Sequence, residues 1–489
     1  MRTFNEQYID GRWRSTRGAA WSRPLINPAT EQPVAIFRAA GHRDIEAAVR
    51  AAQRAFPGYA DTTRKERVRL IQRIAGEYER RFDEVALAIT TEIGAPYEQS
   101  AKRLQAREGL RHLQAVGTSP NPENSDPDVH GSTFVDRPAG VYALITPRHD
   151  AVAHILCSLV SAMLAGCTAV IKPSSRAPLS ARLIAEIVHQ AGVPAGIINL
   201  VFGSGTETGA QLTAHPLIDR VSFIGSHAAA GRVAREVSGA IKPLSLTLRR
   251  MSVEVMLDDD VSDPDITRSV QAAMQAGAHG VAACARLLVP IAKLKEAQAI
   301  AADATHRLIV GDPLDARTTM GPVSSADQLQ RVQEMIATRI SQGADLLAGG
   351  LGRPRGLDQG YYVRPTVFSA RHGLMHETRF DEVGPLLTIM AYRDEHEAIA
   401  IVNRNTTGSV CRIWCRDTPR AQAVARQMRA SLVLVNDAGH GAQTRSAPCQ
   451  WDVGNVLQQP RHAGFIRRQT IIGPTVTPRH TTDFNEESP

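Results

Sequence analysis

The sequence predicts an α/β protein built on parallel β-sheets, because short apolar runs alternate with helical segments along much of the chain. Beyond Asp136, apolar strand-like runs cover residues 140–145, 168–171, 197–201 and 220–224. A helical segment at 178–191 lies between the second and third of these runs. Such alternation is typical of βαβ units, whose crossover helices cover the faces of a parallel sheet.

Two amphipathic helices are expected before these strands. Residues 42–56 carry apolar side chains at helical spacing, and Asp44 lies near the start as a candidate cap. Thr63 and Glu66 have the spacing of a capping box, which predicts a second helix from there through Ile74.

A second alternating block follows in the C-terminal half, with strands expected at 287–290, 308–310 and 432–435. Two stretches lack strong periodicity. Residues 119–131 are rich in Pro, Asn and Asp, which predicts an extended arm, and the polar tail at 474–489 is expected to be disordered.

Charge and cysteine usage exclude several classes of partner. The 489 residues carry a net charge of +7, and the basic side chains are scattered, without zinc-finger spacing, an RNA-binding aromatic pattern or a basic block. We therefore expect no nucleic-acid partner. Cys411 and Cys415 share one face of a strand-like run but have no metal-binding spacing, so no metal site is predicted.

The longest apolar stretch, at 151–171, has almost the length of a membrane span. His154 interrupts it, and Gly166-Cys167 breaks it before a β-type run. A buried helix followed by a buried strand is therefore expected, with no membrane partner. The N-terminus has no apolar signal-peptide core, so a cytoplasmic location is expected.

Several motifs, in order and with consistent spacing, carry a family resemblance. Ile145-Thr-Pro-Arg-His149 stands where the family usually has Pro-Trp-Asn, Ile171-Lys-Pro-Ser-Ser175 matches Lys-Pro-Ser-Glu, and Phe223-Ile-Gly-Ser226 matches a Gly-Ser turn. The later landmarks are Gly311-Asp-Pro313, Gly321-Pro322, Tyr362-Val-Arg-Pro-Thr366, Gly384-Pro385 and Val435-Asn436. From Met1 to about Ile472 the chain resembles the NAD(P)-dependent aldehyde dehydrogenases.

The resemblance implies a Rossmann-type nucleotide-binding domain, an α/β catalytic domain and a β-arm for oligomerisation. The implied ranges are 1–118 and 138–247 for the first, 248–436 for the second, 119–137 and 437–473 for the arm, and 474–489 for the polar tail. A homodimer or homotetramer is expected, because such assemblies are usual in the family.

The resemblance also implies roles in binding NAD or NADP. Lys172 corresponds to the family residue that bonds the adenosine ribose. Gly225 and Ser226 open a helix whose N-terminus can face a pyrophosphate. Four residues separate Ser226 from Gly231, one more than the family usually has.

Other cofactor positions are altered. Ser175 stands where the family has Glu, and Asp381 is one methylene shorter than the family acid. Arg249 and Arg250 replace two glycines over which the nicotinamide lies in the family, and their side chains would collide with it. Whether NAD(P) still binds is left open.

The family's chemistry needs a thiolate nucleophile, a carboxylate base and an amide that stabilises the oxyanion. The matching positions are Val281, Thr247 and His149. Counting forward from Thr247 and back from Arg286 gives the same position 281. Cys284 lies three residues further on and is an alternative nucleophile, although the Gly-Gln that usually precedes the nucleophile is absent.

New basic residues gather at these positions. Arg148, His149, Arg249 and Arg250 replace Trp, Asn, Gly and Gly, and guanidinium forks suit a carboxylate or phosphate. One hypothesis is a basic pocket for an anionic small molecule or an acidic side chain of a partner. The alternative is a degenerate site whose arginines point to solvent or pair with Glu254 or Asp258.

Three functions follow. The favoured one is a non-catalytic homologue that acts as a binding or scaffold subunit, since nucleophile, base and oxyanion donor are all replaced. The second is a repurposed enzyme whose basic pocket acts on an anionic substrate without redox chemistry. The third is an active NAD(P)-dependent aldehyde dehydrogenase that uses Cys284.

Overall fold

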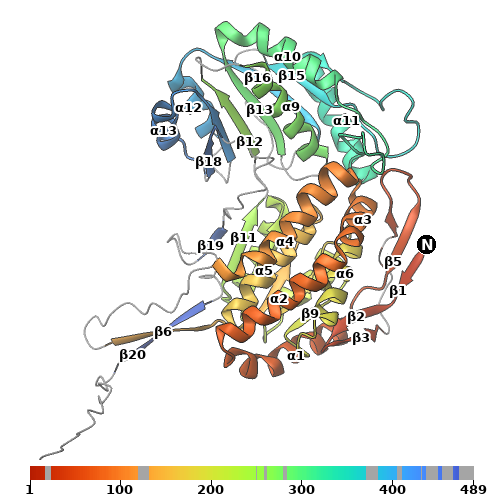
Figure 1. Ribbon diagram of the computed structural model, residues 1–489, viewed down its shortest axis with the longest axis vertical. Coiled ribbons are helices and arrows are strands. Elements are labelled where there is room, and N and C mark those ends of the chain that lie inside the picture. Colours follow the sequence, from red (N-terminus) through yellow and green to blue (C-terminus); the bar gives the residue numbers. More distant parts are fainter. Residues whose placement is uncertain are drawn as a thin grey trace, which may run out of the picture.

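The computed structural model describes most of the chain as two α/β bodies, one above the other in Figure 1. The described residues are 1–16, 22, 24–118, 132–248, 251–257, 262–278, 283–370, 384–404, 410–430, 432–436, 450–453 and 466–472.

The first body is built on an eight-stranded sheet of order β19-β11-β10-β7-β8-β9-β2-β3. Its five consecutive strands from β11 to β9 are parallel, which confirms the predicted sheet type. The strands are β2 (Glu6–Ile9), β3 (Arg12–Ser15), β7 (Val141–Ile145), β8 (Thr168–Lys172), β9 (Ile198–Leu200), β10 (Arg220–Gly225), β11 (Leu244–Leu248) and β19 (Gln450–Val453).

Helices cover both faces of this sheet. Along β7, Tyr142 and Leu144 pack with the layer formed by α2 to α6, whereas Val141, Ala143 and Ile145 pack with α1, α7 and α8. The helices are α1 (His42–Ala60), α2 (Arg64–Arg80), α3 (Phe82–Ile93), η1 (Tyr97–Ala106), α4 (Arg107–Gln114), η2 (Ala115–Thr118), α5 (Ala151–Ala165), α6 (Pro178–Gln190), η3 (Gly205–Gly209), α7 (Ala210–Ala214) and α8 (His227–Ser238).

The local signals for these helices are confirmed. Thr63 and Glu66 form the predicted capping box at the start of α2, and the Asp44 side chain accepts from the Gly41 N–H at the start of α1. The apolar stretch at 151–171 forms the buried helix α5 and most of β8, as expected. Among the described residues, no helix is long and apolar enough to cross a membrane.

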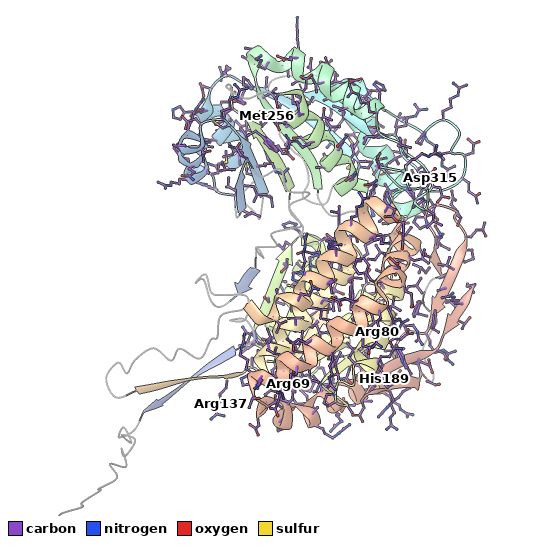
Figure 2. The ribbon with its side chains drawn as sticks, in the orientation of Figure 1. Arg69, Arg80, Arg137, His189, Met256 and Asp315 are labelled. Atoms are coloured by element: carbon purple, nitrogen blue, oxygen red, sulfur yellow. The ribbon has the colours of Figure 1, made fainter. Side chains whose placement is uncertain are left out.

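The second body holds a seven-stranded sheet of order β14-β15-β16-β13-β12-β17-β18, parallel except for the edge strand β14. Met256, at the end of β12, is fully buried inside it (Figure 2). The elements are β12 (Met251–Met256), α9 (Asp263–Ala278), β13 (Ala283–Pro290), η4 (Ile291–Lys293), α10 (Leu294–His306), α11 (Ala326–Ser341), β14 (Asp345–Ala348), β15 (Thr366–Ala370), β16 (Leu386–Tyr392), α12 (Glu395–Asn403), β17 (Val410–Trp414), α13 (Thr418–Gln427) and β18 (Leu432–Val435).

The strand predicted at 308–310 is wrong. Val310 makes only an isolated bridge with Met320, and the N–H groups of Thr319 and Met320 donate to the carbonyl of Ile309. The segment is therefore one side of a local loop. The strands predicted at 287–290 and 432–435 correspond to β13, which begins earlier, and to β18.

Two small sheets complete the fold. β1 (Arg2–Phe4), β4 (Leu25–Ile26) and β5 (Pro33–Phe37) form one in the order β1-β5-β4. β6 (Ser132–Pro138) and β20 (Ile466–Ile472) form an antiparallel ribbon that projects from the first body (Figure 1). Arg137 lies near its base (Figure 2). The domain ranges implied by the resemblance remain a prediction.

A buried carboxylate joins two helices of the first body. Glu92 on α3 accepts from the N–H groups of Leu179 and Ser180 in the first turn of α6, and from the Ser180 hydroxyl. Burial raises the pKa of Glu92 to about 8, although these bonds oppose the shift. The folded state therefore favours the protonated form of Glu92. In the unfolded chain the same carboxyl group loses its proton near its ordinary pKa of 4.5.

Glu92→Gln should change how stability depends on pH. In the wild type, the contribution of this acid is complete at low pH and is lost as pH rises from the unfolded to the folded pKa. The stability of the variant relative to the wild type should increase by up to roughly 1.4 kcal/mol per pH unit between about pH 5 and pH 8. Urea unfolding at several pH values checks this, with the exposed-residue variant Glu296→Gln as control; parallel curves would contradict it.

Candidate functional site

The candidate site lies at the carboxyl ends of the parallel strands in the first body. Ile145 at the end of β7 is in register with Lys172 at the end of β8 and with Phe223 of β10, and Gly225 is in register with Leu248 of β11. Ligands of doubly wound sheets bind at this edge. The fold therefore brings the predicted nucleotide-binding residues to neighbouring strand ends.

Lys172 is a buried cation held by backbone oxygens. Its side chain is 3% exposed, and Nζ donates to the carbonyls of Pro173 at 3.0 Å and Gly203 at 3.2 Å. Burial lowers the pKa of Lys172 to about 8. Ser175, three residues further on, is exposed in the turn before α6.

The turn after β10 leads into a capped helix. Ser226 is the N-cap of α8, and its hydroxyl accepts from the N–H of Ala229 at 3.3 Å, as the predicted helix start requires. A Cβ at Gly225 would lie 2.6 Å from the Phe223 ring, so this position needs glycine. Gly231 lies inside α8.

His149 and Asp150 follow β7 and are both buried. The His149 ring lies edge-on to His154 of α5, with ring centroids 5.8 Å apart. Asp150 adopts a left-handed conformation with φ of 45° directly before α5. We did not predict a role for Asp150, although a carboxylate between a buried strand and a buried helix was a readable signal.

Two arginines of this edge contact the second body. Arg148 donates to Gln328 Oε1 on α11 at 2.9 Å, and Arg176, after β8, donates to Ser325 Oγ at 2.6 Å and pairs with Asp327. These bonds connect the loops after β7 and β8 to the N-terminus of α11.

The predicted catalytic positions are divided between the two bodies. Thr247 lies on β11, in register with Ile224 of β10 and Gln450 of β19. Cys284 is the second residue of β13, which pairs with β12 and β16. Positions predicted for the site that lie outside the described residues are Arg249, Arg250, Val281 and Asp381.

One of the two acids proposed as partners of Arg249 and Arg250 already accepts hydrogen bonds from other residues. Glu254 Oε1 accepts from Arg412 Nη1 at 2.8 Å, and Oε2 accepts from Trp414 Nε1 at 3.1 Å and from Ser269 Oγ at 2.5 Å. Asp258 lies outside the described residues. The anion pocket itself stays a prediction.

Comparisons with known proteins identify the family. The sequence pattern of the Aldehyde dehydrogenase family matches residues 13–449. A curated relative, 3-succinoylsemialdehyde-pyridine dehydrogenase from a Pseudomonas species, is 39% identical over 438 residues, which are 90% of this chain and 92% of the relative. The chain belongs to the aldehyde dehydrogenase family.

Solved structures of the family share the fold. A variant of aldehyde dehydrogenase C from Pseudomonas syringae, crystallised with NAD+ and octanal, is 33% identical with a TM-score of 0.88 and covers 97% of both chains. An aldehyde dehydrogenase from Mycobacterium tuberculosis, crystallised with NAD+, is 27% identical with a TM-score of 0.88; the match covers 97% of this chain and 99% of that one.

Metal ligation has no support within the described ranges. No group of three or more His, Cys, Asp or Glu side chains there could hold a metal ion.

Lys172→Met should stabilise the protein at neutral pH. Because burial depresses the pKa of this lysine, the folded state carries the cost of its charge below about pH 8, and the cost disappears as pH rises toward 10.5. The variant also loses two hydrogen bonds. After subtraction of these, we expect its free energy of unfolding to exceed that of the wild type by about 1 to 3 kcal/mol at pH 7, and by less at pH 10. Urea unfolding at both pH values measures it, with the exposed Lys293→Met as control. A destabilised variant at pH 7 would show that the lysine is structural.

Proposed function

We propose that this protein is an NAD(P)-dependent oxidoreductase that acts on an aldehyde, with Cys284 as its thiol. The observation that carries the proposal is the position of Lys172, Gly225 and Ser226 at the ends of strands of one parallel sheet. Family members with 33% and 27% identity were crystallised with NAD+, and the first of these also with octanal.

The residues present fit the adenosine half of a dinucleotide. The Lys172 ammonium, held now by two carbonyl oxygens, can donate to ribose hydroxyls at the end of β8. The first-turn N–H groups of α8 suit a pyrophosphate because the helix N-terminus favours anions. When bound, NAD(P) would supply the hydride acceptor, and the chain's residues would hold it and supply the nucleophile.

Three of the other described cysteines are poor nucleophiles, whereas the fourth, Cys157 on α5, is half-buried. Cys167, Cys411 and Cys415 are buried, and burial raises the pKa of Cys167 to about 11 and that of Cys411 further. Cys284 lies near the start of β13, three residues from the family's nucleophile position. We assign it to aldehyde attack because no other described cysteine lies so near that position in the sequence.

A second candidate function is a binding subunit without aldehyde turnover. Val281, Thr247 and His149 at the three chemical positions favour it. A basic pocket of Arg148, His149, Arg249 and Arg250 would then hold an anionic ligand, in a scaffold subunit or in an enzyme without redox chemistry.

Assembly is proposed on the same basis. The ribbon of β6 and β20 extends away from the first body and offers a surface for a second copy of the chain (Figure 1). We propose a homodimer or homotetramer, and light scattering of the full chain should give a mass of two or four times 53.0 kDa. A monomeric mass at micromolar concentration would contradict the assembly.

The function is tested by binding and turnover in three proteins. Calorimetric titration of the wild type with NAD and NADP should show saturable binding, and NADH or NADPH should form with octanal. Cys284→Ala should abolish the turnover but leave nucleotide binding in place, because the thiol does not hold the nucleotide. Val281→Cys is the matched variant that returns a thiol to the family position.

Each outcome selects one function. If the wild type binds NAD(P) but turns over no aldehyde, and Val281→Cys gains turnover, the protein is a nucleotide-binding homologue without thiol chemistry. If Cys284→Ala turns over aldehyde like the wild type, Cys284 is not the nucleophile. If no nucleotide binds but a dicarboxylate does, and Arg249→Gly with Arg250→Gly abolishes that binding, the anion pocket is the functional site.

A further inference from the structure

Asp150 carries a buried carboxyl group whose position the fold does not explain. The residue is 8% exposed, has φ of 45° and ψ of 34°, and occupies the N-cap position of α5. An aspartate at an N-cap ordinarily accepts from the N–H of the second or third helical residue, but here no such bond forms. Its Oδ1 atom is buried and has no hydrogen-bond partner within the part of the chain that the structure describes.

A second carboxyl group faces the same region from α4, which packs beside α5 (Figure 1). Burial, and then the charge of Glu108, raise the pKa of Asp150 to about 7. Glu108 has neighbours of its own, because Arg111 Nη1 lies 3.1 Å and His112 Nε2 lies 3.6 Å from its carboxylate. The unbalanced acid is therefore Asp150, and a buried carboxylate is costly until a cation or proton donor meets it.

The half-buried residues of α5 lie on the same side of the helix as this carboxyl. Of the fifteen residues of α5, only His154, Cys157 and Ser158 are not buried. They follow Asp150 by four, seven and eight residues and therefore share one helical face with it. Asp150 and the preceding His149 follow the end of β7, at the carboxyl edge of the first sheet where Ile145 is in register with Lys172.

A hydroxyl group adds a second acceptor at this end of β7. Thr146 is 4% exposed, and its Oγ1 is also buried without a partner among the described residues. An ammonium group or a protonated ring nitrogen donates hydrogen bonds and carries the charge that a carboxylate needs. Arg148 of the same loop is directed to Gln328 on α11.

We propose that Asp150 is a specificity-determining residue that binds a protonated nitrogen of the substrate, so that the substrate class is an aldehyde carrying an amine or another basic nitrogen. The inference rests on the proposed function, because it places this nitrogen beside an aldehyde site at the same sheet edge. Asp150 would bind a cation, whereas the predicted arginine pocket would bind an anion. One binding measurement with charged probes therefore distinguishes the two sites.

The test uses two small probes of equal length, n-butylamine and 1-butanol, titrated by calorimetry into the full-length protein at neutral pH. The wild type should bind the amine with a Kd at least roughly 10-fold lower than the alcohol. Asp150→Asn should remove that preference while it keeps the shape and the left-handed backbone, which asparagine tolerates. The control is Asp303→Asn, which removes an exposed carboxylate of α10 that pairs with Arg307.

Three results would overturn the inference. The first is equal binding of amine and alcohol by the wild type, and the second is an unchanged amine preference in Asp150→Asn. The third is amine binding that appears only after Arg249→Gly with Arg250→Gly, which would show that Asp150 serves as an internal partner of these arginines.

Measurements of NAD binding and octanal oxidation on the same proteins distinguish a failure of this inference from a failure of the proposed function. If the wild type binds NAD and oxidises octanal but shows no amine preference, the inference fails alone. If the wild type neither binds NAD nor oxidises octanal, but prefers the amine through Asp150, the proposed function fails and Asp150 still forms a cation-binding site.

Discussion

Parallel pairing of β7 with β8 and β10 is the constraint on which the rest of the first body depends. Alternation along β7 sends Val141, Ala143 and Ile145 to one helical layer and Tyr142 and Leu144 to the other. A shift of one residue would exchange these two sets between layers of different helices, so the register is strongly specified. The same register fixes which residues end the strands, and through them the positions of Lys172, His149 and the start of α8.

Buried ionisable groups divide into those that the fold uses and those that it only tolerates. Glu92 and Glu254 each have three donors, which join α3 to α6 and α9 to β12 and β17. Lys172 donates to carbonyl oxygens of two loops, whereas the Asp150 carboxyl does not cap its helix and joins no two elements among the described residues. Lys172 and Asp150 lower the stability of the fold and do not hold two of its described helices or strands together, which is typical of residues at functional positions.

The sequence could predict elements whose signals are local. The strands at 140–145 and 168–171 and the helix starts at Thr63 and Ser226 depend on apolar spacing and on one side chain bonding to nearby N–H groups. The segment 308–310 has the same apolar content, but a strand needs a partner, and Val310 meets only Met320. The place of Asp150 between a buried strand and a buried helix is visible in the sequence, but its proximity to Glu108 of α4, more than thirty residues earlier, is not a local signal.

Placement of the two bodies decides what a thiol at position 284 can do. Three residues of chain span at most about 10 Å, so a thiol at position 284 and one at position 281 can lie up to that distance apart. The nucleotide residues belong to the first sheet and Cys284 to the second. The spacing between them is set in part by Arg148 on Gln328 and Arg176 on Ser325. Hydride transfer demands contact geometry between reacting atoms, so a reaction through Cys284 needs the aldehyde carbon close to the start of β13. A carboxylate that anchors the far end of the substrate, as Asp150 would, is one way to fix that carbon in place, since it restrains the ligand from the first body while the thiol approaches from the second.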